Sequence, residues 1–125
     1  MDLNNAVIKL CVNGTQAEFE GRKDAACELY RQAWNVATDD YEACIAAHYM
    51  ARCQDAPEDI LRWNQKALER ANAVNDERAK DFYPSLYLNL GHSYELLGNR
   101  DEAKRYFGSG FCAGCYSSIG LKNTK

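Results

Sequence analysis

The sequence predicts an all-α fold in which about six antiparallel helices stack into an α-α superhelix. Apolar residues recur at helical spacing along most of the chain. Only two prolines occur among its 125 residues, and no stretch alternates apolar and polar residues for long. A pattern of small and aromatic residues also returns along the chain, which is typical of a repeat architecture.

At 125 residues the chain is long enough to form one domain with a substantial core. Its net charge of −3 argues against a broad basic surface for nucleic acid or anionic membranes. No apolar run is long enough to span a bilayer, and the first residues lack the layout of a secretory signal. We therefore expect a cytoplasmic protein with no nucleic-acid or membrane partner, whose six cysteines are reduced and packed.

The first predicted hairpin joins helices of about 2–20 and 23–36. Asp2 can cap the first helix, and Gly21 suits the left-handed residue that follows its end. We expect the core face of the first helix to include Val7, Leu10, Ala17 and Phe19. The core stripe of the second helix is expected to be Ala26, Leu29, Tyr30, Ala33 and Trp34.

The second predicted hairpin joins helices of about 41–53 and 57–74. Either Asp39 or Asp40 can cap its first helix. That helix is rich in alanine, which lets neighbouring helix axes approach closely. Pro57 suits the first position of the second helix, where its missing N–H is not needed.

The third predicted hairpin joins an unusually long helix of about 77–97 to a helix of about 100–111. Pro84 lies inside the long helix, so either the helix is kinked there or a short helical turn precedes a helix that begins at Pro84. We predict the kinked, continuous helix. Gly98 suits the residue just past its end. Residues 112–125 are interrupted by glycine and are predicted to form an irregular tail.

An internal repeat becomes visible when the last turn of the chain is placed over the first. The aligned pairs are Gly98 and Gly21, Gly91 and Gly14, Ala103 and Ala26, and Phe107 and Tyr30. The middle unit matches less well, because Asn64 stands at the aromatic place while Ala67 keeps a small residue. We therefore divide one domain, 1–111, into units of about 7–40, 41–74 and 75–111, the third of which is extended.

The best unit resembles the tetratricopeptide repeat through its Leu90-Gly91-x-x-Tyr94 motif, followed by Gly98, Ala103 and Phe107. Residues 84–117 follow the family pattern closely, residues 7–40 follow it well, and residues 41–74 follow it mainly in helix pattern. The resemblance implies a right-handed helical solenoid whose first helices line a concave groove. It also implies a non-enzymatic adaptor that binds a protein or peptide segment in this groove, without a cofactor.

By the same resemblance, the predicted binding residues lie on the first, third and fifth helices. Asn89 can donate to and accept from a peptide backbone, and Arg52 can pair with a carboxylate. For any one of them, an ordinary solvated side chain is the open alternative. The predicted groove residues are Tyr49, Arg52, Asn89, His92, Glu95, Glu42, Ile45 and Leu88. The same helix faces also carry Ile8, Cys11, Thr15, Glu18 and Ser85.

The main alternative function rests on the thiols of Cys112 and Cys115. Their spacing suits half of a metal site or a redox pair. A structural zinc site needs two more ligands, and the chain has no second pair of this kind. No phosphate-binding glycine loop, nucleophile elbow or metalloprotease helix is present either, so no metal and no enzymatic activity are predicted.

The last predicted hairpin leaves an apolar face that no seventh amphipathic helix covers. Repeat arrays usually end in a helix with a polar outer face. We hypothesise that this face is covered by self-association into a homo-oligomer, by the tail folding back, or by a partner. A sedimentation experiment that finds a monomer with a disordered tail and no bound apolar partner would contradict the hypothesis.

Overall fold

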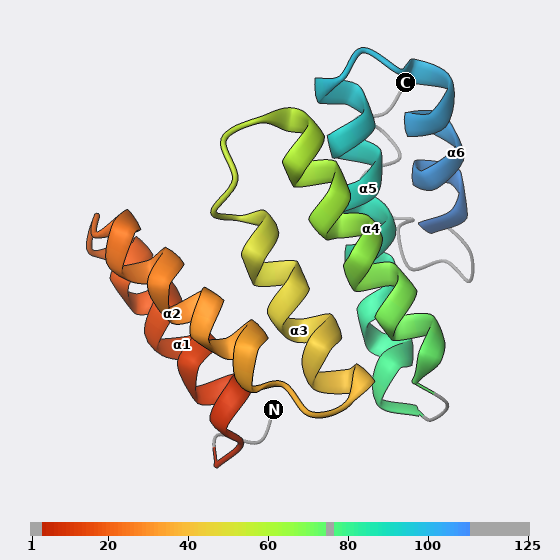
Figure 1. Cartoon of the computed structure of the whole chain (residues 1–125). Helices are drawn as coiled ribbons and strands as arrows, with labels where there is room; N and C mark the ends of the chain where they lie inside the picture. Colours follow the sequence, from red (N-terminus) through yellow and green to blue (C-terminus); the bar gives the residue numbers. More distant parts are fainter. Residues whose placement is uncertain (1–3, 75–76, 111–125) are drawn as a thin grey trace.

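The computed structural model describes residues 4–74 and 77–110, and it confirms an all-α fold. In these ranges the chain forms helices and no strand, and none of the described helices is both long and apolar enough to cross a membrane. The elements in order are α1 (Ala6–Phe19), α2 (Lys23–Val36), α3 (Asp40–Ala51), α4 (Pro57–Ala73), the 3-10 helix η1 (Glu77–Phe82), α5 (Tyr83–Leu96) and α6 (Arg100–Gly110) (Figure 1).

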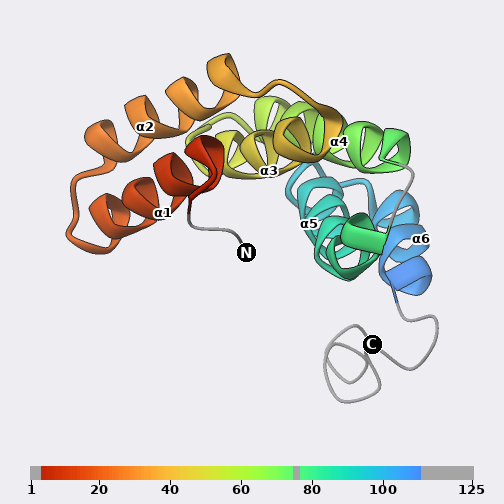
Figure 2. The same ribbon diagram turned by 90° about the horizontal axis from the view of Figure 1, so that it is seen from below.

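The helices pack as successive antiparallel pairs, α1 with α2, α3 with α4, and α5 with α6 (Figure 1). Figure 2 shows that the pairs bend into an arch, with α1, α3 and α5 on its inner side and α2, α4 and α6 on its outer side. Between the pairs, α1 and α2 both pack on α3, whereas α5 packs chiefly on α4. The arrangement agrees with the predicted α-α superhelix.

The first helix is capped by Asn5, and the predicted cap at Asp2 is wrong. The Asn5 side-chain oxygen accepts hydrogen bonds from the backbone N–H groups of Val7 at 2.8 Å and Ile8 at 3.1 Å. These are two of the N–H groups that a helix start leaves without an intrahelical partner. Because Asn5 satisfies them, α1 begins at Ala6.

The other predicted ends agree more closely with the structure. Gly21 and Gly98 have φ values of 82° and 80°, the left-handed conformation that favours glycine after a helix end. Asp39 is the cap of α3, with its side chain accepting from the Glu42 N–H at 2.8 Å. Pro57 occupies the first turn of α4, as its fixed φ and missing N–H favour.

The predicted kinked helix through Pro84 is wrong, and the alternative is the one observed. The chain forms the short 3-10 helix η1 and then starts α5 at Tyr83, with Pro84 in the first turn. Proline has no backbone N–H, and its ring disfavours an α-helical backbone conformation in the residue before it. A fresh helix start places Pro84 where neither property costs a hydrogen bond.

The first and last hairpins are held by the same contact between a glycine and an aromatic ring. A Cβ atom built on Gly14 would lie 2.8 Å from Cδ1 of Tyr30, and one built on Gly91 would lie 2.6 Å from Cδ1 of Phe107. Both rings are buried, Tyr30 fully and Phe107 to 7% exposure. The glycines therefore let the two helices of each hairpin close over a ring, as the aligned sequence pairs indicate.

The middle hairpin exchanges these two residue types. The spacing from His48 to Asn64 equals that from Gly14 to Tyr30, so His48 corresponds to Gly14 and Asn64 corresponds to Tyr30. A large side chain therefore takes the place of the glycine, and a smaller polar side chain takes the place of the aromatic ring. Asn64 is only 5% exposed. This exchange puts polar groups at the junction of α3 and α4, next to α5.

The core forms two clusters, one joining α1, α2 and α3 and one joining α3, α4 and α5. The first contains Val7, Ile8, Cys11, Ala17, Ala26, Tyr30, Ala33, Ile45 and Ala46. The second contains Cys44, Ala47, Ala67, Ala71 and Leu86. The predicted core position of Phe19 is wrong, since this side chain is 88% exposed. It shares an outward face of α1 with the half-exposed Val12, because residues seven apart lie on one side of a helix.

Candidate functional site: the groove between α3 and α5

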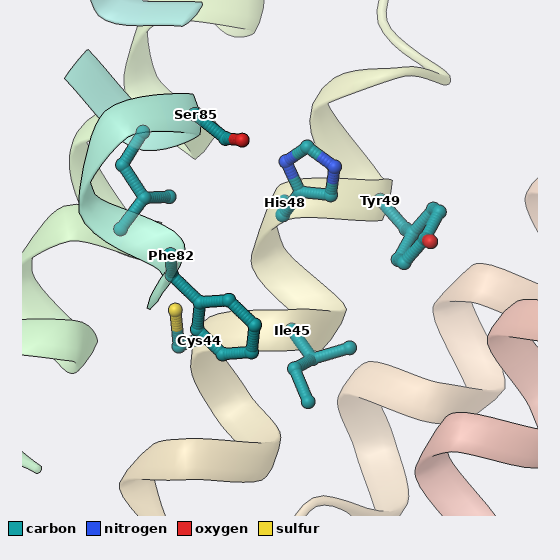
Figure 3. Close-up of a pocket in the computed structure, with 7 residues that line it drawn as sticks. Cys44, Ile45, His48, Tyr49, Phe82 and Ser85 are labelled. Atoms are coloured by element: carbon teal, nitrogen blue, oxygen red, sulfur yellow. The ribbon is translucent and has the colours of Figure 1, made fainter. Parts of the chain in front are cut away.

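The inner side of the arch is hollowed between α3 and the start of α5. A recess of about 120 Å³ lies here, with more apolar than polar surface. Figure 3 shows His48 directed from α3 toward Ser85 of α5, and the ring of Phe82 between Cys44 and Ile45. The recess, which we call the lower recess, is lined by Cys44, Ile45, His48, Tyr49, Phe82, Ser85 and Leu86.

A second recess of about 200 Å³ lies further along the same two helices. Its floor includes residues of α4, and its rim includes Leu96, which is 61% exposed. We call it the upper recess, and it is lined by His48, Ala51, Arg52, Ile60, Asn64, Asn89, His92, Ser93 and Leu96. His48 lines both recesses, so its side chain forms the wall between them.

A chain of hydrogen bonds joins the three helices around the upper recess. Asn64 Nδ2 of α4 donates to Ser93 Oγ of α5 at 2.8 Å, and that hydroxyl donates to the backbone oxygen of Asn89 at 2.8 Å. Asn89 Nδ2 in turn lies 3.2 Å from Nδ1 of His48 on α3. Buried polar groups that are satisfied in this way fix one arrangement of the elements that carry them.

The environment of His48 favours its neutral form. Burial lowers the pKa of this imidazole from its usual value, and the positive charge of Arg52 lowers it further. The ring of Tyr49 stands edge-on to it, with the centroids 4.9 Å apart. The recess wall is therefore an uncharged, amphipathic ring near neutral pH.

Arg52 pairs with a carboxylate of this chain, that of Glu18 on α1. Its Nε lies 2.8 Å from Glu18 Oε1 and its Nη2 lies 3.3 Å from Oε2. The hydroxyl of Tyr30 also donates to Glu18 Oε1 at 2.6 Å. Burial alone would raise the pKa of Glu18, but the hydrogen bonds from Arg52 and Tyr30 hold it below its usual value. The pair ties α1 to α3 beside the upper recess.

The hairpin that forms one wall of both recesses was compared with protein families. Residues 84–108, in α5 and α6, match the family model described as the tetratricopeptide repeat. This hairpin is therefore similar to a tetratricopeptide repeat. Neither the search of curated proteins nor that of solved structures gave a match. Tetratricopeptide repeats suggest a module for protein–protein interaction, since stacked helical repeats create concave binding surfaces.

The α5–α6 hairpin supplies four of the predicted groove residues. Asn89 and His92 line the upper recess, whereas Leu88 and Glu95 line neither recess. His92 is exposed, with Nδ1 3.3 Å from Glu95 Oε1 and its ring edge-on to Phe107 at 5.3 Å. Leu88 is half-buried.

The part of the chain that precedes the α5–α6 hairpin supplies the other four. Arg52 lines the upper recess, while Ile45 and Tyr49 line the lower one. Tyr49 also stacks on Tyr30, with the centroids 5.1 Å apart. Glu42 lies outside both recesses and accepts from Asn5 Nδ2 and from the Thr38 N–H, each at 2.8 Å.

Several side chains on the predicted groove face belong to the core instead. Ile8 and Cys11 are each 2% exposed, because α1 packs directly on α3, and burial raises the pKa of the Cys11 thiol to about 12. Conversely, the predicted groove residues do not include His48, Asn64 or Phe82, which line the recesses. The exchange of residue types in the middle unit is the sequence signal for the first two.

The alternative thiol or metal site lies outside the described residues, as does the predicted tail. The four cysteines that the structure places, Cys11, Cys27, Cys44 and Cys53, form no disulfide. In the described ranges no three histidine, cysteine or acidic side chains lie together as a metal site would need. Within the described residues, the candidate site is the groove formed by the two recesses.

Proposed function

We propose that the chain is a non-enzymatic interaction module that binds a peptide or protein segment in the groove between α3 and α5. The single observation that carries this proposal is the pair of adjoining recesses on the inner side of the arch, of which Figure 3 shows the lower one. Ligand sites typically combine an apolar lining with a few placed polar groups. Here Ile45, Phe82 and Leu86 supply the apolar part, and His48 and Asn89 supply the polar part.

In this proposal an extended segment lies along the groove, with apolar side chains in the recesses. Asn89 and His92 reach its backbone or polar side chains from α5. The partner is a protein rather than nucleic acid, because the net charge of −3 provides no excess of cations for phosphate. A role as a cytoplasmic adaptor, without a cofactor, belongs to the same proposal.

The test is a selection from a displayed library of random peptides on the immobilised chain. For a selected peptide, Asn89→Ala should raise Kd about tenfold, since a lost hydrogen bond of about 1–1.5 kcal/mol corresponds to roughly that factor. Lys66→Ala is the matched control, because Lys66 lies over the rings of Trp34 and Trp63 and lines neither recess. The proposal would be contradicted if the Kd were unchanged in Asn89→Ala and raised in Lys66→Ala.

A further inference from the structure

The contact between His48 and Asn89 has a direction that fixes the tautomer of the imidazole. The amide nitrogen of Asn89 can only donate, so His48 Nδ1, 3.2 Å away, must accept. The proton of the neutral ring is then on Nε2. Among the described residues, no hydrogen bond to Asn89 Oδ1 is formed, and this oxygen is not among the buried polar atoms without a partner. The side-chain amide is thus held by His48 alone and keeps its oxygen available to a ligand.

Protonation of His48 reverses this contact. In the imidazolium both ring nitrogens carry hydrogen, so Nδ1–H would face the amide N–H of Asn89 and the hydrogen bond would be lost. A half-turn of the Asn89 carboxamide about its Cβ–Cγ bond restores a hydrogen bond between the two side chains, because Asn89 Oδ1 then accepts from His48 Nδ1–H. The same half-turn places the NH₂ group where the oxygen had been.

We propose that His48 is a positioning residue for the Asn89 carboxamide, and that its protonation turns the amide over. The groove then offers a hydrogen-bond acceptor to its ligand when His48 is neutral and a donor when His48 is charged. Ligand binding in the groove rests on the proposed function. The rotation of the amide is a property of the free protein and does not depend on it.

The groups around His48 favour its neutral state. Burial and Arg52 both oppose its charge, although Arg52 is itself paired with Glu18. From α4 it is faced by the uncharged Ile60 and Asn64. The titratable or charged side chains around it are Cys44 and Tyr49 on α3 itself, Arg52 at the end of α3, His92 and Glu95 on α5, and Glu18 on α1. His92 is the second histidine of the groove, so the test includes a variant at this position.

The experiment is a pH titration of the ¹⁵N-labelled free protein from about pH 8 to about pH 5, the range in which histidine changes charge. The expected result is that the Asn89 side-chain amide signals and the His48 ring nitrogens move with one common midpoint, below the usual histidine value of about 6.5. Above it, the ring nitrogens should report the tautomer protonated at Nε2. The Asn89 change should vanish in His48→Gln and persist in His92→Gln.

Three results would overturn the positioning role. The first is an Nδ1–H tautomer of His48 near pH 8, which is read from the unmodified protein. The second is that the Asn89 side-chain signals stay constant while His48 titrates. The third is that the change in the Asn89 signals follows His92 instead. A peptide selected near pH 7.5 supplies the binding test, with an expected loss of about tenfold in affinity at a pH below the His48 midpoint found in the titration, a loss that is absent in His48→Gln. An Asn89 titration in a chain that selects no peptide would leave the positioning role standing and refute the proposed function.

Discussion

Replacing Gly91 by alanine tests the contact on which the hairpins are built. The new Cβ would lie 2.6 Å from Cδ1 and 2.9 Å from Cζ of Phe107, and closer still to Cε1. Real Cβ atoms do not approach a ring atom so closely, so the ring or α6 must move. The ring is 7% exposed and touches His92 edge-on, which leaves it little room.

The expected net loss of stability is about 1–2 kcal/mol. Overfilling a packed core costs roughly 1–3 kcal/mol. Removing a glycine from a helix interior returns roughly 0.5–1 kcal/mol, because the unfolded chain loses conformational freedom. For a domain of this size, the melting temperature should fall by on the order of 5–10 °C.

Urea unfolding followed by far-ultraviolet circular dichroism measures this loss. Gly108→Ala is the matched control, because a Cβ on this other helical glycine meets nothing within 4 Å. It should be neutral or stabilising by up to about 1 kcal/mol. The double variant Gly91→Ala, Phe107→Leu should be less destabilised than the two single changes added together, since the smaller side chain makes room. Equal stability of Gly91→Ala and the wild type would refute the close-packing explanation, as would an equal loss in Gly108→Ala.

Three further predictions concern the groove. The folded pKa of His48 lies below its unfolded value of about 6.5. The contribution of the neutral imidazole to stability is therefore complete above that pH and is lost as the pH falls through the folded pKa. Urea unfolding at several pH values should show this loss, and His48→Gln should lack it. Arg52→Ala should raise the pKa of Glu18 toward its usual value in an NMR titration, and should cost no more than about 1 kcal/mol because the pair is partly exposed. Asn64→Ala should lower the free energy of unfolding by about 1–3 kcal/mol, since the buried hydroxyl of Ser93 loses the group that donates to it. Thermal unfolding measures this loss. An unchanged melting temperature would show that the hydrogen-bond network does not stabilise the fold.

Much of the fold follows from signals that are local in the sequence. The glycines at 21 and 98 and the proline at 57 end or start helices through their own backbone properties. The position of Pro84 is not decided by local signals, because the backbone properties of proline allow either a kinked helix or a new helix start. The structure resolves the choice through η1, whose Phe82 packs against residues of both core clusters.

The candidate site is less accessible to sequence reasoning, because it depends on how the hairpins meet. Helical spacing puts Ile8 and Ile45 on the inner faces of their helices, but it does not show that α1 and α3 pack together and bury them. The opening between α3 and α5 arises because α5 packs on the preceding hairpin chiefly through α4. The exchange of residue types at His48 and Asn64, in contrast, is readable from the aligned repeat. Whether the eight predicted groove residues bind a partner stays a prediction.

Chemical-shift mapping with a library-selected peptide tests the proposed groove most directly. We expect the largest backbone shifts in the wild-type chain to fall on α3 near Ile45 and His48 and on α5 near Asn89 and His92. The shifts should require several times more peptide in Asn89→Ala. Shifts gathered instead around Trp34 and the outer faces of α2 and α4, or a titration unchanged by Asn89→Ala, would contradict binding between α3 and α5.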